Sequence, residues 1–207
     1  DAQRTMNTYI GACSLLNPED IDEKLVQNSK ITYLEGYCWE EQLAKESLIK
    51  AAEIAHKFGN KVSLTLSDPF CVERHRSEFK ELIKKHIDIL FANEMEIKKL
   101  YEIDNFDESA KEISSITEIA ALTRGENGAK IYNDKKVTDI KPKIFNKVVD
   151  TTGAGDLFAA GFLYGLSKKF SILESGNIAS ISAGEIISHF GAKPETNLKD
   201  LLSKELK

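Results

Sequence analysis

The chain has 207 residues, of which 42% are hydrophobic and 29% are charged, and its formal net charge is −5. These values are typical of a globular protein with one core, and they exclude the broad basic surface that binds nucleic acid or anionic lipid. No run approaches the roughly 20 consecutive apolar residues of a membrane span. Three cysteines without CxxC spacing and four histidines without an HxxxH pair argue against a zinc site and favour the reducing cytoplasm.

The first predicted element is a strand over residues 5–13. A strand without an earlier partner would leave its backbone groups unpaired, so we expect a preceding strand and a chain that is the C-terminal part of a longer protein. Residues 17–20 predict a turn into a short helix, with Pro18 near its first position. The β-branched and aromatic residues 31–34 predict the next strand.

Strand and helix patterns alternate through the rest of the chain, which predicts a doubly wound, three-layer α/β/α fold with a mostly parallel sheet. The predicted helices are 41–58, one around Phe79 and Ile83, 94–101, 107–113, 157–166, and one or two more up to Leu206. The predicted strands are 62–66, 87–91, 119–122, a hairpin of 129–132 with 137–140, and a strand that ends at Val148-Val149.

Polar segments follow three of the predicted strands, at residues 93–96, 123–128 and 150–156. In doubly wound sheets, ligands bind outside the carboxyl ends of the strands. Each segment carries glycines or carboxylates directly after an apolar run. Three such segments together indicate a ligand site more strongly than any one of them alone.

The segment 150–156, with the sequence DTTGAGD, is the most informative of the three. Its two glycines let the backbone turn tightly and open a helix whose first N–H groups lack intrahelical partners. Such a turn binds anions, most commonly phosphate. Asp156 would place a carboxylate where a phosphate and an acceptor hydroxyl could meet, which indicates phosphoryl transfer. The alternative is a structural strand–helix connection whose glycines serve packing.

Two other phosphate-binding motifs fit the sequence less well. The dinucleotide fingerprint G-x-G-x-x-G would need a glycine at the position of Phe158. The Walker motif G-x-x-x-x-G-K-[ST] occurs nowhere in the chain. A Rossmann protein that binds NAD is therefore disfavoured, and binding of a nicotinamide cofactor would be needed to revive it.

The segment 150–156 and the LFAAGF that follows it resemble the C-terminal signature of the ribokinase-like (PfkB-type) sugar and nucleoside kinases, and the resemblance extends from Arg4-Thr5-Met6 to Gly191-Ala192. It implies a kinase core over residues 16–207 and the remnant of a small β lid over residues 1–15. The N-terminal third of the family, which carries substrate-binding Asp and Gly-Gly segments, would be missing. We therefore expect a fragment of this extent to be inactive.

The resemblance also implies roles for residues of the turn 150–156, here called the glycine turn. Asp156 matches the catalytic base that takes the proton from the acceptor hydroxyl. The backbone N–H groups of Gly153, Ala154, Gly155 and Asp156 match the anion hole that receives charge on the transferring phosphoryl group. Both roles suit a reaction that depends mainly on positioning and charge stabilisation.

Asp150 and Thr152 match positions that help hold a monovalent cation in several family members. Carbonyl groups around Ile186, His189 and Gly191 would complete that site. The resemblance therefore implies ATP and Mg²⁺ as cofactors and K⁺ as a candidate third.

The other two segments resemble the family's magnesium and nucleotide motifs. Asn93 and Glu96 fit Asn-x-x-Glu, which places Mg²⁺ and the phosphates, and Mg²⁺ needs only one or two carboxylates. Taken alone, they would equally form a helix N-cap with an acidic first turn. Thr123, Gly125 and Gly128 resemble the nucleotide-binding turn Thr-x-Gly-x-x-Gly, whose alternative is a plain turn before a hairpin.

The resemblance implies an ATP-dependent kinase that phosphorylates a hydroxymethyl group of a nucleoside or sugar. Residues 6–9 (MNTY), 35–37 (EGY) and 67–70 (SDPF) look most like bacterial adenosine-kinase-like members. Ribokinase or fructokinase specificity is the nearest alternative, because the purine or sugar would be recognised largely by the missing N-terminal segment. Ala179-Ser180 stands where many members carry an Asn beside the adenine, which is a departure from the family pattern.

A non-catalytic nucleotide-binding protein is an alternative from another class, and retention of Asp156 with an intact Gly-Ala-Gly argues against it. We expect a small-molecule partner, neither nucleic acid nor membrane, and a homodimer formed by pairing of the lid strand.

Overall fold

The computed structural model describes residue 2 and residues 7–206. Contacts divide the chain into two compact units, and each is described by itself. The first, here called the N-terminal unit, comprises Thr8–Leu122 and Tyr132–Lys136. The second, here called the C-terminal unit, comprises Asp1–Asn7, Thr123–Ile131 and Val137–Lys207.

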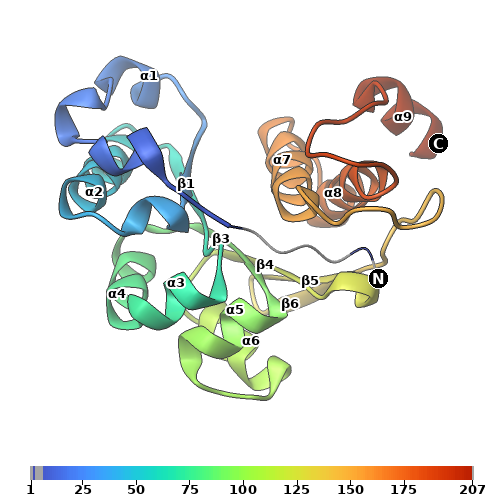
Figure 1. Ribbon diagram of the computed structural model, residues 1–207, viewed down its shortest axis with the longest axis horizontal. Helices are drawn as coiled ribbons and strands as arrows, with labels where there is room; N and C mark the ends of the chain where they lie inside the picture. The colour runs from blue at the N-terminus through green and yellow to red at the C-terminus, as the bar shows by residue number, and fades with distance from the viewer. Residues whose placement is uncertain (1, 3–6, 207) are drawn as a thin grey trace. The chain divides into compact units, whose positions relative to one another are not determined.

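Six strands form one sheet in the order β1-β2-β3-β4-β5-β6, with β1 to β3 paired in parallel (Figure 1). The strands are β1 Ile31–Glu35, β2 Lys61–Thr65, β3 Ile89–Asn93, β4 Ile119–Thr123, β5 Ala129–Asn133 and β6 Lys136–Ile140. A two-residue loop joins β5 to β6, and its residues Asp134 and Lys135 have φ values of 49° and 62°. This left-handed pair is the backbone of a type I′ hairpin turn, so the predicted hairpin is confirmed.

The helices alternate with the parallel strands as the sequence predicts, which confirms an α/β fold. They are α1 Glu23–Gln27, α2 Gln42–Lys57, α3 Pro69–Arg74, α4 Arg76–His86, α5 Glu94–Tyr101, α6 Phe106–Ser114, α7 Ala154–Ser167, α8 Ile172–Ile186 and α9 Leu198–Glu205. Short 3₁₀ helices occupy Gly11–Leu15, Pro18–Asp20, Gly36–Trp39 and Gly125–Asn127. None of these helices within the described chain combines the length and apolar character needed to cross a membrane.

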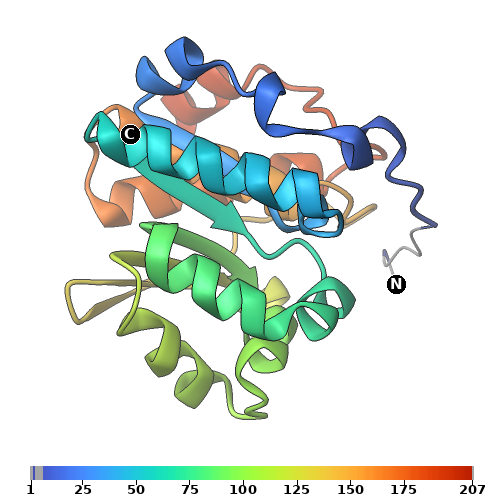
Figure 2. The same cartoon turned by 90° about the vertical axis from the view of Figure 1, so that its left-hand side faces the viewer.

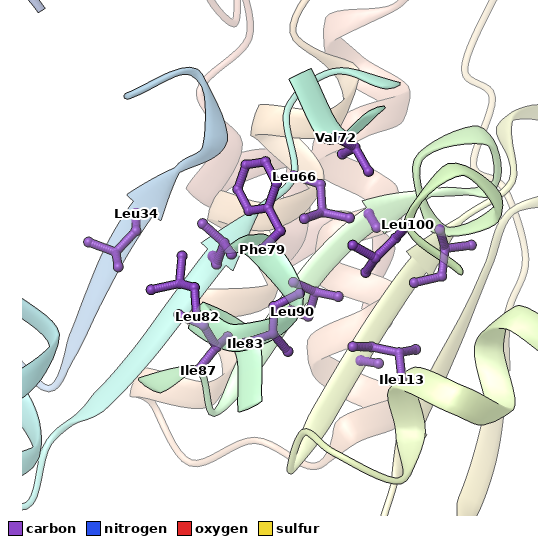
Figure 3. Close-up of a cluster of buried hydrophobic side chains, with 14 of the residues drawn as sticks. Leu34, Leu66, Val72, Phe79, Leu82, Ile83, Ile87, Leu90, Leu100 and Ile113 are labelled. Carbon is purple, nitrogen blue, oxygen red and sulfur yellow. The ribbon is translucent and has the colours of Figure 1, made fainter. Parts of the chain in front are cut away.

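The core of the N-terminal unit forms between the sheet and the helices of the βα crossovers. The strand register aligns Leu34 with Leu64 and Leu64 with Leu90, and all three side chains are buried. The long helix α2 packs along β1 and β2 (Figure 2). Figure 3 shows Leu34 and Leu90 in one cluster with Phe79 of α4. This core fixes the carboxyl ends of β1, β2 and β3, and the polar segment 93–96 begins at the end of β3.

The C-terminal unit is built on close contact between α7 and α8, which lie side by side (Figure 1). A Cβ atom on Gly165 of α7 would lie 2.5 Å from Ser175 Oγ of α8. On α8, a Cβ atom on Gly176 would lie 2.4 Å from the Ile140 side chain of β6. Residues without side chains therefore let α8 pack tightly against both α7 and the hairpin.

Two predicted strands are wrong within the described residues. Residues 5 and 6 of the predicted strand 5–13 lie outside those residues, and its other end forms a 3₁₀ helix at Gly11–Leu15, because Gly11 takes a left-handed φ of 63°. Val148-Val149 belongs to no strand: Val149 N–H donates to Ile187 O at 2.8 Å, a single bond rather than a ladder. The glycine turn therefore does not follow a strand directly, and the homodimer expected from the lid strand stays a prediction.

Candidate functional site

The turn 150–156 is organised by the carboxylate of Asp150. Its Oδ1 accepts hydrogen bonds from Thr152 N at 2.9 Å and Thr152 Oγ1 at 2.6 Å. Its Oδ2 accepts a hydrogen bond from Gly191 N at 3.1 Å. Both oxygens therefore bind protein donors, and the side chain ties the turn to a loop that follows α8. The K⁺ site expected around Asp150 and Thr152 stays a prediction.

Gly153 is the N-cap of α7 and takes a left-handed φ of 79°, which favours glycine. A Cβ atom there would also lie 3.3 Å from both Cα and Cβ of Ala192. The Ala154 N–H donates to Thr151 O at 3.2 Å, so this group is already engaged within the turn. Within the described chain, the N–H groups of Gly155 and Asp156 have no such partner, as the opening of a helix leaves them.

Gly155 differs from Gly153 because nothing in the fold explains the missing side chain. It is exposed, it lies inside α7, and a Cβ atom on it would meet no atom within 4 Å. Asp156 is the exposed acidic residue beside it in the first turn of the helix. The helix start thus combines free backbone donors, open space and a carboxylate, which is the chemistry needed to receive an anion beside a base.

The turn after β4 is closed by backbone hydrogen bonds. Arg124 N donates to Gly128 O at 2.7 Å, and Gly128 N donates to Gly125 O at 3.0 Å. A Cβ atom on Gly128 would lie 2.1 Å from Ile140 O, so only glycine fits against β6. Thr123, which ends β4, and this turn belong to the same C-terminal unit as the glycine turn. A plain turn would explain these contacts as well, so the nucleotide-binding role stays a prediction.

Asn93 and Glu96 form a complete capping box at the start of α5, in the N-terminal unit. Glu96 N donates to Asn93 Oδ1 at 2.8 Å, and Asn93 N and Nδ2 donate to the two carboxylate oxygens of Glu96 at 2.9 and 2.7 Å. Glu96 is only 4% exposed. Burial raises the pKa of the Glu96 carboxyl to about 7; the hydrogen bond from the Asn93 backbone opposes that rise, and the charge of Asp68 adds to it.

Asp68 is a site residue for which the sequence alone suggested no role. Its Oδ1 caps α3 by accepting hydrogen bonds from Phe70 N at 2.6 Å and Cys71 N at 3.0 Å. Its position three residues beyond the carboxyl end of β2, comparable to that of Asn93 at the carboxyl end of β3, was the signal that could have identified it. Asp68 and Glu96 interact electrostatically and offer the hard oxygen ligands that Mg²⁺ prefers, so the donor set fits that ion. Among the described residues, no three His, Cys, Asp or Glu side chains form a closed metal-binding group.

A family model described as "pfkB family carbohydrate kinase" matches residues 1–198. Among solved structures, a probable sugar kinase from Rhizobium etli is 43% identical with a TM-score of 0.93, and 96% of this chain aligns with 60% of that one. The adenosine kinase from Sinorhizobium meliloti is 41% identical with a TM-score of 0.93, and 96% of this chain aligns with 61% of that one.

A more distant structure, a candidate ribokinase II from E. coli in complex with ATP and Mg²⁺, shares the fold. It is 17% identical with a TM-score of 0.84, and 93% of this chain aligns with 63% of that one. The chain therefore spans about 60% of the length of the Rhizobium etli and Sinorhizobium meliloti kinases.

Proposed function

Because this chain belongs to the pfkB family of carbohydrate kinases, we propose that the full-length protein transfers the terminal phosphoryl group of ATP to a hydroxymethyl group of a nucleoside, with adenosine as the first candidate. The 41% identity to the Sinorhizobium meliloti adenosine kinase supports adenosine. The 43% identity to the Rhizobium etli sugar kinase makes a sugar of the ribose or fructose type the alternative acceptor.

The observation that carries the proposal is the open start of α7. Gly155 leaves space that no protein atom fills within 4 Å, next to the exposed carboxylate of Asp156. A purely structural turn would need glycine at Gly153, for its φ and its contact with Ala192, but would not need one at Gly155. Space for an anion at a helix start, with a base beside it, is what phosphoryl transfer to a hydroxyl requires.

In the proposed reaction, Asp156 accepts the proton of the acceptor hydroxyl as the hydroxyl oxygen attacks the γ-phosphorus of ATP. A bond forms between that oxygen and phosphorus, and the bond from phosphorus to the ADP oxygen breaks. The N–H groups of Gly155 and Asp156 stabilise the charge that develops on the transferring group. Gly153 and Asp150 fix the direction of these donors, through the left-handed cap and the hydrogen bonds within the turn.

The remaining residues have roles in cofactor binding under this proposal. Thr123, Gly125 and Gly128 bind the nucleotide through the turn after β4. Glu96, held by Asn93 and assisted by Asp68, would hold Mg²⁺, in part through water. When bound, the ion would supply positive charge to the phosphates. The E. coli complex with ATP and Mg²⁺ supports this choice of cofactors by likeness of fold.

The proposal is tested with Asp156→Asn in the full-length protein. We expect turnover with ATP and adenosine to fall by about 100- to 10,000-fold, because the base is lost while the N–H donors remain. ATP affinity, measured by calorimetry, should stay close to that of the wild type. Asp200→Asn is the matched control, because Asp200 is an exposed acid in the first turn of another helix, α9. Turnover near the wild-type level in Asp156→Asn would refute the assignment of the base.

A panel of nucleosides, ribose and fructose separates the two acceptor classes. Phosphorylation of adenosine at a higher kcat/KM than any sugar supports the nucleoside, and the reverse order supports the sugar kinase. A wild-type protein that binds ATP and phosphorylates no member of the panel would favour the non-catalytic alternative.

A further inference from the structure

Glu185 is a buried acid in the C-terminal unit that the proposed reaction does not use. It lies in the last turn of α8 and is 3% exposed. A buried carboxylate is costly unless donors or a counter-charge satisfy it, so its partners indicate what it does.

The carboxylate holds both ends of the loop 188–196, which follows α8. Its Oε1 accepts hydrogen bonds from Glu195 N at 3.0 Å and Thr196 N at 2.7 Å. Its Oε2 lies 3.4 Å from His189 Nε2 at the other end of the loop. Both of these facing atoms are buried, and neither makes a hydrogen bond within the described residues.

The geometry of His189 favours the charged imidazolium. Its Nδ1 lies 3.2 Å from Phe190 O, a carbonyl that can only accept a hydrogen bond, while Nε2 faces a carboxylate. A neutral ring has one nitrogen that cannot donate, whereas the imidazolium donates from both. The hydrogen bond to Phe190 O and the charge of Glu185 raise the pKa of His189 accordingly. Glu195 Oε1 lies 3.9 Å from Nδ1 and adds to the negative surroundings.

The loop held in this way supports the glycine turn. Gly191 N donates to Asp150 Oδ2 at 3.1 Å, and Ala192 lies where a Cβ atom on Gly153 would approach within 3.3 Å. Gly191 takes a left-handed φ of 94°, so the loop needs a particular backbone conformation to place this donor. A continuous series of contacts thus runs from Glu185 through the loop to Asp150 and Gly153.

We propose that Glu185 is a positioning residue, which holds the loop 188–196 in the conformation that orients the turn 150–156 for phosphoryl transfer. This inference rests on the proposed function, because the turn is the group that Glu185 positions. Glu185 touches neither substrate nor cofactor. Its effect reaches the reacting groups through Gly191 and Ala192.

The first test is amide hydrogen exchange, followed by mass spectrometry on the full-length protein. In Glu185→Ala, we expect faster exchange in peptides that cover 188–197 and in peptides that cover 150–157. Glu185→Gln should stay close to the wild type, because its amide oxygen still accepts from Glu195 and Thr196 and its NH₂ can donate to a neutral imidazole. Wild-type exchange over 150–157 in Glu185→Ala would overturn the proposal.

The second test is kinetic, with ATP and adenosine, and uses Ile178→Ala as the control for lost stability. Ile178 is 1% exposed on the same helix and has no part in the loop contacts given above. Per folded molecule, Glu185→Ala should lower kcat by about 10- to 100-fold with both KM values nearly unchanged, because a misplaced turn impairs transfer more than binding. An equal loss of kcat in Ile178→Ala would overturn the proposal.

His189→Phe provides a second variant should Glu185→Ala not fold. It removes the counter-charge and keeps a ring, so we expect faster exchange over the same two regions and a smaller loss of kcat. Unchanged exchange and kcat in this variant would contradict the proposal. If the wild type phosphorylates no acceptor, the proposed function fails, but the exchange experiments still decide whether Glu185 holds the turn.

Discussion

Gly165 of α7 lies against Ser175 of α8 so closely that a Cβ atom on the glycine would be 2.5 Å from the serine Oγ and 2.7 Å from its Cα. The clash would involve backbone as well as a side chain, so a rotamer change could not relieve it. We therefore expect Gly165→Ala to separate the two helices and lower the free energy of unfolding by about 1–3 kcal/mol. Chemical denaturation of the full-length protein measures this loss, and unchanged stability would show that the helices repack freely.

Gly155→Ala is expected to separate stability from activity. The added methyl group meets no protein atom within 4 Å and lies inside a helix, so stability should be unchanged or rise by about 0.5–1 kcal/mol. Activity should fall, because the methyl group enters the space assigned to the phosphoryl oxygens. Thermal melting and steady-state kinetics on the same preparation give both values. Full activity in Gly155→Ala would contradict the proposal that the phosphoryl group occupies the space beside Gly155.

Asn93→Ala should lower the free energy of unfolding by more than an ordinary loss of a helix cap does. The change removes the acceptor for Glu96 N and one of the two donors to the Glu96 carboxylate, which stays buried. Of the three bonds, the Asn93 N–H donor survives the substitution, since it belongs to the backbone. We expect a loss of about 1–3 kcal/mol in chemical denaturation.

Asn105→Ala is the matched control, because Asn105 caps α6 by accepting from Glu108 N at 3.1 Å at an exposed position. Its cost should be about 1 kcal/mol. If Asn93→Ala and Asn105→Ala lower the free energy of unfolding equally, Glu96 finds other hydrogen-bond partners when the Asn93 side chain is lost.

Glu40 should make the N-terminal unit sensitive to acid. Burial raises the pKa of the Glu40 carboxyl, but hydrogen bonds and charge from Arg74 and His75 outweigh burial and hold the pKa at about 2. His75 Nε2 lies 2.9 Å from Glu40 Oε2, and Arg74 binds the other oxygen. Because the folded pKa is depressed from 4.5, the stabilisation is complete above that pH and is lost as the pH falls through about 2.

The variant Glu40→Gln should therefore have a lower free energy of unfolding than the wild type at pH 7. This difference in free energy should disappear as the pH approaches 2. Denaturation followed by circular dichroism across this range measures the difference. Glu81→Gln serves as the control, because Glu81 pairs with Lys85 at an exposed position of α4. If the free energies of unfolding of Glu40→Gln and the wild type differ by the same amount at every pH, Glu40 is not the source of the acid sensitivity.

Local patterns in the sequence were sufficient for the strands and for most of the α-helices between residues 31 and 140, although α3 was not predicted. The predicted helix 94–101 has the observed bounds Glu94–Tyr101, because Asn93 and Glu96 supply a capping box within four residues. The predicted strand 87–91 is displaced by two residues, since β3 continues to the cap residue Asn93 itself. The glycine turn could also be predicted from the sequence, because the DTTGAGD segment contains both of its glycines and its carboxylates.

Contacts between distant residues could not be read in this way. Gly11 ends an extended pattern through its φ, and Val149 finds its partner at Ile187 rather than on a neighbouring strand. The charge of Asp68 raises the pKa of Glu96, which lies 28 positions further along the sequence. Glu185 accepts hydrogen bonds from backbone amides of a loop that has no regular sequence pattern. Such roles depend on the folded backbone, and no spacing of residue types encodes them.

The bond between Asp150 and Gly191 also bears on how the protein is made. The two residues are 41 positions apart, and a ribosome delivers the chain from its N-terminus. The turn 150–156 can form its local bonds as soon as it emerges, but it receives the Gly191 donor and the Ala192 contact only after α8 has been synthesised. A nascent chain therefore cannot complete the contacts of the turn 150–156 until the loop 188–196 has been translated as well.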